Sequence, residues 1–152
     1  MKIIIASDHA GVAYKAVLVK EMQEKGYTVN DLGTFDPNQP DDYPDYAIKV
    51  AEAILAKQGE KGIIICGSGV GVSVAANKFK GIRAGVCHDT YSAHQCVEHD
   101  DVNVLCIGQR VIGIELAREV VFTFLKAVFS NEERHVKRLK KIAFIEDSNM
   151  KS

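Results

Sequence analysis

The stretch GIIICGSGVGVSVAANK, residues 62–78, joins a strand-like apolar run, a glycine-rich turn and the start of a helix. Residues 62–66 carry no charged or polar uncharged side chain except a thiol, which is typical of a strand covered on both faces of a parallel sheet. Gly67, Gly69 and Gly71 alternate directly behind it, and residues 72–78 follow with helical spacing. This order predicts an α/β fold with a ligand site at the turn.

The same alternation repeats from end to end of the chain. Apolar runs typical of strands occupy residues 2–6, 28–32, 62–66, 83–87 and 103–107, and helical spacing occurs over 12–24, 46–57, 72–78, 91–99, 114–129 and 132–146. We therefore expect an α/β fold, a Rossmann-like three-layer α/β/α sandwich with a five-stranded parallel sheet. The chain of 152 residues predicts a single domain over 1–152, with the proline-containing segment 36–46 as a surface loop.

Composition narrows the class of partner. The formal net charge is −1, so no overall basic field would draw the protein to nucleic acid or to an anionic membrane surface. We expect neither a secretory segment nor a transmembrane segment, because the first apolar run is short and residues 111–129 are interrupted by charges. The four cysteines form no C-x-x-C pair, which favours free thiols and a cytoplasmic protein that binds small molecules or copies of itself.

Cys66 stands where the amides of the turn and the dipole of the following helix can meet a negative charge. These donors favour a thiolate, which can act as a base, and they can stabilise an oxyanion formed on a substrate. A base beside an oxyanion site is the arrangement that proton abstraction next to a carbonyl group requires. A buried thiol at a strand end is the commoner role of such a cysteine, so the residue pattern leaves both functions open.

A nucleotide site and a metal site are the other kinds of site that the sequence could encode. A dinucleotide fingerprint would need a glycine at position 72 or 74, where valines stand, although Asp89 lies where a ribose-binding acid could follow. A nucleotide-binding domain without catalysis therefore stays as an alternative. His94, Cys96 and His99 share one helical segment but match no zinc motif, and we expect no metal.

Further candidates are histidines at segment ends and a basic helix face. His9 follows the first strand, and His99 ends the fourth helical segment, so both are candidate acid–base groups. Arg134, His135 and Arg138 fall on one face of the last helix and could hold a phosphate. A solvated basic face is the alternative for this last group, because lysines surround it.

Several motifs together resemble the type B ribose-5-phosphate isomerases and the related galactose-6-phosphate isomerase subunits, the ribose/galactose isomerase family. They are ASDHAG (6–11), DYPDYA (42–47), ICGSGVGVSVAANK (65–78), GIRAGVC (81–87), EHDDVNVLCIGQRVIG (98–113) and RHVKRLKKI (134–142). The resemblance covers nearly the whole chain. It implies an aldose–ketose isomerase that interconverts ribose 5-phosphate and ribulose 5-phosphate through an enediolate, with no metal or organic cofactor. Six-carbon substrates such as allose 6-phosphate or galactose 6-phosphate remain the alternative.

The resemblance also implies roles for individual residues. Cys66 would be the base that moves the proton, Ser68 and the turn would hold the enediolate oxygens, and Asp8 and His99 would act on ring opening and the sugar hydroxyls. The substrate-binding set would be His9, Tyr43, Gly67, Gly69, Val70, Gly71, Asp100, Arg110, Arg134 and Arg138, with His9 and the three arginines at the phosphate.

In this family the site is shared between two subunits. The resemblance therefore implies a homodimer, or a dimer of dimers, in which His99, Asp100 and Arg110 face the Cys66 turn of a partner. Two positions depart from the family pattern. Asp100 stands where asparagine is usual, and Glu132 and Glu133 stand where two glycines are usual. A carboxylate at position 100 would repel an enediolate unless it points away or pairs with a cation.

Overall fold

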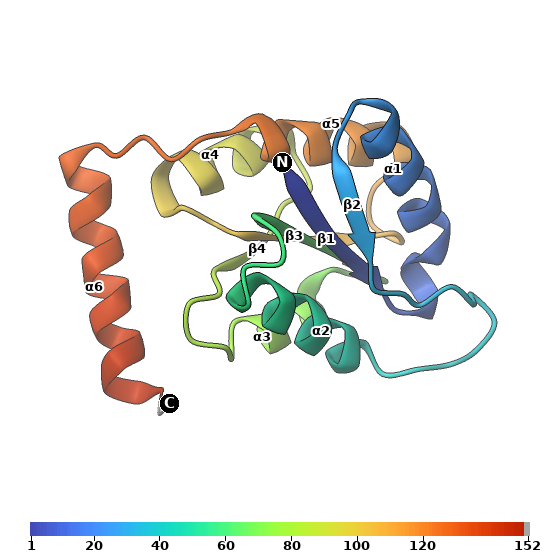
Figure 1. The fold of residues 1–152 in the computed structure, drawn as a ribbon, viewed down its shortest axis with the longest axis horizontal. Helices are drawn as coiled ribbons and strands as arrows, with labels where there is room; N and C mark the ends of the chain where they lie inside the picture. The colour runs from blue at the N-terminus through green and yellow to red at the C-terminus, as the bar shows by residue number, and fades with distance from the viewer. Residues whose placement is uncertain (151–152) are drawn as a thin grey trace.

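The computed structural model describes residues 1–150, and Figure 1 shows a sheet between two helical layers, with a last helix at one side. All strand pairs in this part of the chain are parallel, in the order β2-β1-β3-β5-β4. The five strands are β1 (Lys2–Ser7), β2 (Thr28–Asp31), β3 (Lys61–Cys66), β4 (Ala84–Val86) and β5 (Val104–Gly108). The predicted three-layer fold with a five-stranded parallel sheet is confirmed.

Two apolar clusters, one on each face of the sheet, account for the apolar strand runs. Side chains alternate between the faces, so Ile3 and Ile5 pack on one side while Ile4 packs on the other. One face is covered by α1 (Val12–Glu24), α4 (Thr90–Asp100) and α5 (Ile114–Lys126), and the other by α2 (Tyr43–Leu55) and α3 (Val70–Ala76). Because both faces are buried, the central strands need apolar residues at every position.

The strand order creates a crevice at one edge of the sheet. From β1 the chain crosses to β2 on one side, and β3 then lies on the other side of β1. The loops that follow β1 and β3 therefore diverge, which leaves room for a ligand beyond the carboxyl ends of these strands. We call this side the carboxyl edge, and the side where the strands begin the amino edge.

Several helix boundaries differ from the sequence prediction. Helix α2 begins at Tyr43 within the predicted loop 36–46, because Pro44 is tolerated in the first turn of a helix. Helix α5 ends at Lys126 and not at the predicted residue 129. At this end of the helix, Lys61 Nζ donates to the carbonyls of Phe124 and Ala127 at 2.7 and 2.9 Å. A short 3₁₀ turn, η1 (His9–Gly11), was not predicted.

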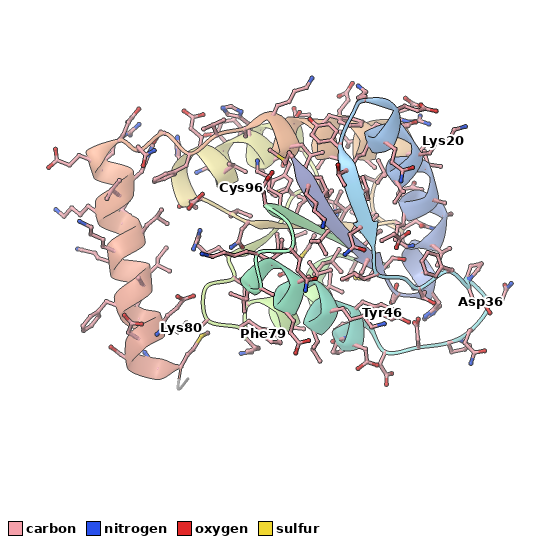
Figure 2. All side chains as sticks on the ribbon, viewed as in Figure 1. Lys20, Asp36, Tyr46, Phe79, Lys80 and Cys96 are labelled. Atoms are coloured by element: carbon pink, nitrogen blue, oxygen red, sulfur yellow. The ribbon has the colours of Figure 1, made fainter. Side chains whose placement is uncertain are left out.

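The last helix, α6 (Glu133–Asn149), is longer than the predicted 132–146 and stands beside the sheet (Figure 1). Its first turn is attached through His135, which is 1% exposed. Its last turns bind the segment before β4, since Asp147 pairs with Lys80, which Figure 2 labels beside this end of the helix. Like the other helices within residues 1–150, α6 lacks the length and apolarity that a membrane crossing requires.

Substitution of Gly11 tests whether η1 has to pack directly against the backbone of β3. A Cβ at this position would lie 2.6 Å from the carbonyl oxygen of Ile65, while the φ of −107° is acceptable for alanine. We expect Gly11→Ala to lower the free energy of unfolding by about 1–3 kcal/mol, because backbone atoms cannot move aside easily. Gly113→Ala is the matched control, since a Cβ there has nothing within 4 Å. Equal stability of the two variants in urea denaturation would contradict the packing argument.

Candidate active site

A pocket of about 370 Å³ opens at the carboxyl edge, where β1, β3 and β5 end. Its lining comes from these strand ends and from the start of α2. The lining residues are Asp8, His9, Ala10, Tyr43, Cys66, Gly67, Ser68, Gly71, Arg110 and Val111. Most of the predicted site residues therefore lie around one pocket, and Ala10 and Val111 are lining residues that the sequence analysis did not name.

Cys66 is the last residue of β3 and is 4% exposed. Its Sγ accepts a hydrogen bond from the amide of Gly69 at 3.1 Å. Gly69 has a φ of +79°, a conformation in which glycine is favoured, and this turns its N–H back toward the sulfur. The sulfur of Cys66 therefore lies at the pocket wall with a main-chain donor directed at it.

The turn of residues 66–71, which we call the Cys66 turn, rests on the end of β5. Gln109 donates its amide to the carbonyl of Cys66 at 2.9 Å, and Arg110 donates to the carbonyl of Gly67 at 3.0 Å. Within the turn, the amide of Val70 donates to Ser68 Oγ at 3.2 Å. Hydrogen bonds within the chain thus fix the backbone of the turn and the Ser68 hydroxyl in place.

Two glycines of the turn allow larger side chains to lie directly against it. A Cβ on Gly67 would be 3.2 Å from Nη1 of Arg110, and a Cβ on Gly71 would be 2.6 Å from the ring of Tyr43. The guanidinium of Arg110 therefore lies over the turn of its own chain. This differs from the expectation that Arg110 faces a partner's turn, because the backbone bond to Gly67 ties residue 110 to the strand beside it.

Asp8 follows β1 and is buried in the pocket wall. Its carboxylate caps η1 by accepting the amide of Ala10 at 3.0 Å. Burial raises the pKa of Asp8 above its ordinary value, against the opposing effects of the Ala10 amide, His9 and Arg110. Asp8 can therefore hold a proton at a higher pH than an exposed aspartate.

His9 is fixed by an aspartate that the sequence analysis placed only in a loop. Asp41 accepts from both the backbone amide of His9, at 3.0 Å, and its Nδ1, at 2.6 Å. Burial acts to raise the pKa of Asp41, but the hydrogen bonds from His9 outweigh it and the net direction is downward. The potential ligand atoms of Asp8, His9 and Asp41 lie within 4.8 Å of one another, and the Asp41 bond leaves Nε2 of His9 for a further partner.

Four predicted residues, His99, Asp100, Arg134 and Arg138, lie at the amino edge. Helix α4 leads from the end of β4 back to the start of β5, so His99 and Asp100 at its last turn are on the opposite edge from Cys66. Helix α6 begins beside them, because the rings of His99 and His135 stack with 4.1 Å between centroids. His99, Asp100, Arg134 and Arg138 are therefore separated from the Cys66 pocket of the same chain.

The amino-edge residues have contacts of their own. Arg134 is exposed and its Nε pairs with Glu132 at 2.9 Å, and Arg138 is exposed on the same helix. His135, by contrast, is buried and its Nδ1 lies 2.6 Å from Ser130 Oγ, so the predicted basic face does not present all three side chains to solvent. Asp100 lines a cavity of about 270 Å³ beneath α6 that also includes Arg83.

A parallel α/β sheet with a pocket at its switch point is typical of small-molecule-binding proteins of the Rossmann-like class. Within that class, the chain matches the model of the Ribose/Galactose Isomerase family over residues 3–142. The chain therefore belongs to this family, and the resemblance carried by the sequence motifs is confirmed.

Individual relatives agree with the family assignment. Ribose-5-phosphate isomerase B of Escherichia coli (strain K12) is 45% identical over 145 residues, which cover 95% of this chain and 96% of that protein. The structure of Clostridium thermocellum ribose-5-phosphate isomerase B has a TM-score of 0.93 and 46% identity, covering 97% of this chain and 99% of the other. The Mycoplasma genitalium enzyme with bound ribulose-5-phosphate has a TM-score of 0.91 and 38% identity, with 97% of each chain covered.

The carboxylates of Asp8 and Asp41 predict opposite pH effects on stability. The folded state holds the Asp8 proton more tightly than the unfolded state, so stability should fall as pH rises from 3.8 through the folded pKa. Asp8→Asn keeps a capping side chain and cannot ionise, so it should gain stability relative to wild type between pH 4 and pH 7. Asp41→Asn should lose stability relative to wild type at pH 7, because ionised Asp41 is stabilised by His9 and that stability is lost only as pH falls through its lowered folded pKa.

Urea denaturation of the three proteins across this pH range measures both effects. The sign of each difference is the readout, since global acid destabilisation affects all three chains alike. A fall in the stability of Asp8→Asn relative to wild type with rising pH would contradict the burial argument.

Proposed function

We propose that this protein interconverts ribose 5-phosphate and ribulose 5-phosphate through an enediolate, with Cys66 as the general base. The observation that carries the proposal is the hydrogen bond from the Gly69 amide to Cys66 Sγ at the wall of the carboxyl-edge pocket. Membership of the ribose/galactose isomerase family supports the reaction class, and relatives at 45% and 46% identity are named for this activity.

The reaction moves one proton between adjacent carbons of the open-chain sugar phosphate. Cys66 removes the proton from C2 of the aldose, and the electron pair of that C–H bond forms a C1–C2 double bond. The π electrons of the C1–O1 carbonyl move to O1, which gives the enediolate. Return of the proton to C1, with O1 gaining a proton and O2 losing one, yields the ketose without net oxidation. One base that reaches both carbons is sufficient, because C1 and C2 are bonded neighbours.

The other pocket residues support the two ends of this step. Ser68 Oγ and the amides of the Cys66 turn supply donors for the oxygens on which charge develops. Asp8, whose pKa burial raises, exchanges protons with the sugar hydroxyls during ring opening. Arg110 and His9 attract the phosphate, which holds the substrate's other end away from the base.

We further propose that the working site is shared between two copies of the chain. His99, Asp100, Arg134 and Arg138 lie at the amino edge, so they can act on a substrate only at the carboxyl-edge pocket of a partner. The exposure of Arg134 and Arg138 on α6 supports this arrangement. The active form is then a homodimer or a dimer of dimers. The free thiols Cys66, Cys87, Cys96 and Cys106 support a reducing compartment, and we place the enzyme in the cytoplasm.

Removal of the thiol tests the base. We expect Cys66→Ala to lower kcat for ribose 5-phosphate by at least about a thousandfold while sugar-phosphate binding persists, because the variant loses its proton acceptor. Cys106→Ala is the matched control, since Cys106 is fully buried in the core and burial raises its pKa. Turnover is measured with ribose 5-phosphate and with allose 6-phosphate, and the ratio of the two kcat/KM values shows whether the enzyme prefers a five-carbon or a six-carbon substrate. Retention of more than about a tenth of the wild-type rate would contradict the role of Cys66.

Mixing of two inactive variants tests the shared site. Cys66→Ala and His99→Ala should each be inactive, but dissociation and reassociation of an equal mixture should restore roughly a quarter of wild-type turnover. Random pairing makes half of the dimers hybrid, and each hybrid contains one site with both residues intact. If the mixture stays inactive although hybrid dimers are detected by mass spectrometry, His99 and Cys66 do not meet across an interface.

A further inference from the structure

His88 holds the end of the strand that supports the Cys66 turn. Gly108, the last residue of β5, donates its amide to Nε2 of His88 at 2.9 Å. The neighbouring strand β4 ends at Val86, and beyond it Cys87 donates to the carbonyl of Cys106 at 3.3 Å. In a parallel ladder, the Gly108 amide would donate to a backbone carbonyl of the neighbouring strand. Because β4 ends before this point, the imidazole of His88 accepts that amide in place of a carbonyl.

This bond requires a neutral imidazole with a particular tautomer. Nε2 can accept only through its lone pair, so the ring proton must be on Nδ1. His88 is half-buried, and burial lowers its pKa, with the carboxylate of Asp89 acting in the opposite direction. The neutral form is thus favoured near neutral pH, where the acceptor is needed.

Gly108 is in direct contact with the Cys66 turn. A Cβ on Gly108 would lie 2.6 to 2.7 Å from Cα, C and O of Ser68, so the two backbones touch. Gly69 packs against the same place, since a Cβ there would be 3.1 Å from the nitrogen of Gly108. Just beyond Gly108, the amides of Gln109 and Arg110 donate to the carbonyls of Cys66 and Gly67. A shift of Gly108 would therefore move both the turn and Arg110.

We propose that His88 is a positioning residue of the active site. By accepting the Gly108 amide it holds the end of β5, and through it the Cys66 turn and Arg110, in the geometry that proton transfer needs. This inference rests on the proposed function of the Cys66 turn. His88 does not line the pocket and acts through Gly108 alone.

Three substitutions separate the hydrogen bond from the volume of the ring. His88→Phe keeps a ring of similar size and removes the acceptor. His88→Gln places an amide oxygen as many bonds from the backbone as Nε2, whereas His88→Asn carries the same amide one carbon short. We expect kcat for ribose 5-phosphate to fall about tenfold or more in His88→Phe and His88→Asn, with a smaller change in KM, and to recover most of this loss in His88→Gln.

The amide of Gly108 gives a readout that does not depend on turnover. Its hydrogen exchange, measured by NMR on the assembled protein without sugar phosphate, should be about tenfold or more faster in His88→Phe and His88→Asn than in wild type, and slow again in His88→Gln. Melting temperatures check that each variant is folded. If His88→Phe does not fold, the comparison of His88→Gln with His88→Asn stands by itself, because both are amides.

Each outcome decides the proposal. Fast Gly108 exchange together with lowered kcat, both reversed in His88→Gln, supports the positioning role. Unchanged exchange in His88→Phe, wild-type kcat in that variant, or equal impairment of His88→Gln and His88→Asn would overturn it. Should Cys66→Ala retain turnover, the proposed base would fail, but the exchange measurement would still report whether His88 holds Gly108.

Discussion

The contact between the backbones of the Cys66 turn and the end of β5 is the constraint on which the site depends. Strands β3 and β5 finish side by side, with Cys66 opposite Gly108 in the parallel register. Glycine at 108 lets Ser68 approach within a distance that no Cβ would allow, and glycine at 69 lets its amide return to the Cys66 sulfur. Helix α3 and the pocket wall then follow from the direction in which this turn leaves the sheet.

Burial and hydrogen bonding give two neighbouring carboxylates opposite tendencies. Asp8 is enclosed at the end of β1 and its pKa rises, while Asp41 accepts two hydrogen bonds from His9 and its pKa falls. The two carboxylates therefore differ in how tightly they hold a proton, because one is enclosed and the other accepts hydrogen bonds. Asp41 thus favours the ionised form that holds His9 in place, and Asp8 holds its proton more tightly than an exposed aspartate does.

The topology divides the predicted site residues of one chain between two edges of the sheet. Each strand-to-strand helix returns from the carboxyl edge to the amino edge, so residues at strand ends and residues at helix ends are carried apart. His99 and Cys66 are separated in this way, and α6 adds Arg134 and Arg138 to the amino-edge group. A site that needs both groups is complete only when two copies of the chain meet.

The amino-acid sequence by itself determined the layers of the fold, the number of parallel strands and the position of the Cys66 turn, because local periodicity and glycine spacing specify these features. It did not determine that α2 begins at Tyr43, just before Pro44. Nor did it determine that Asp41 holds His9 or that His88 accepts from Gly108, since the residues of these pairs are 32 and 20 apart in the chain and only folding brings them together. The same holds for Arg110, whose place over Gly67 depends on the pairing of β3 with β5. Periodicity records which face of an element is buried, whereas contacts between loops depend on the packing of the whole sheet.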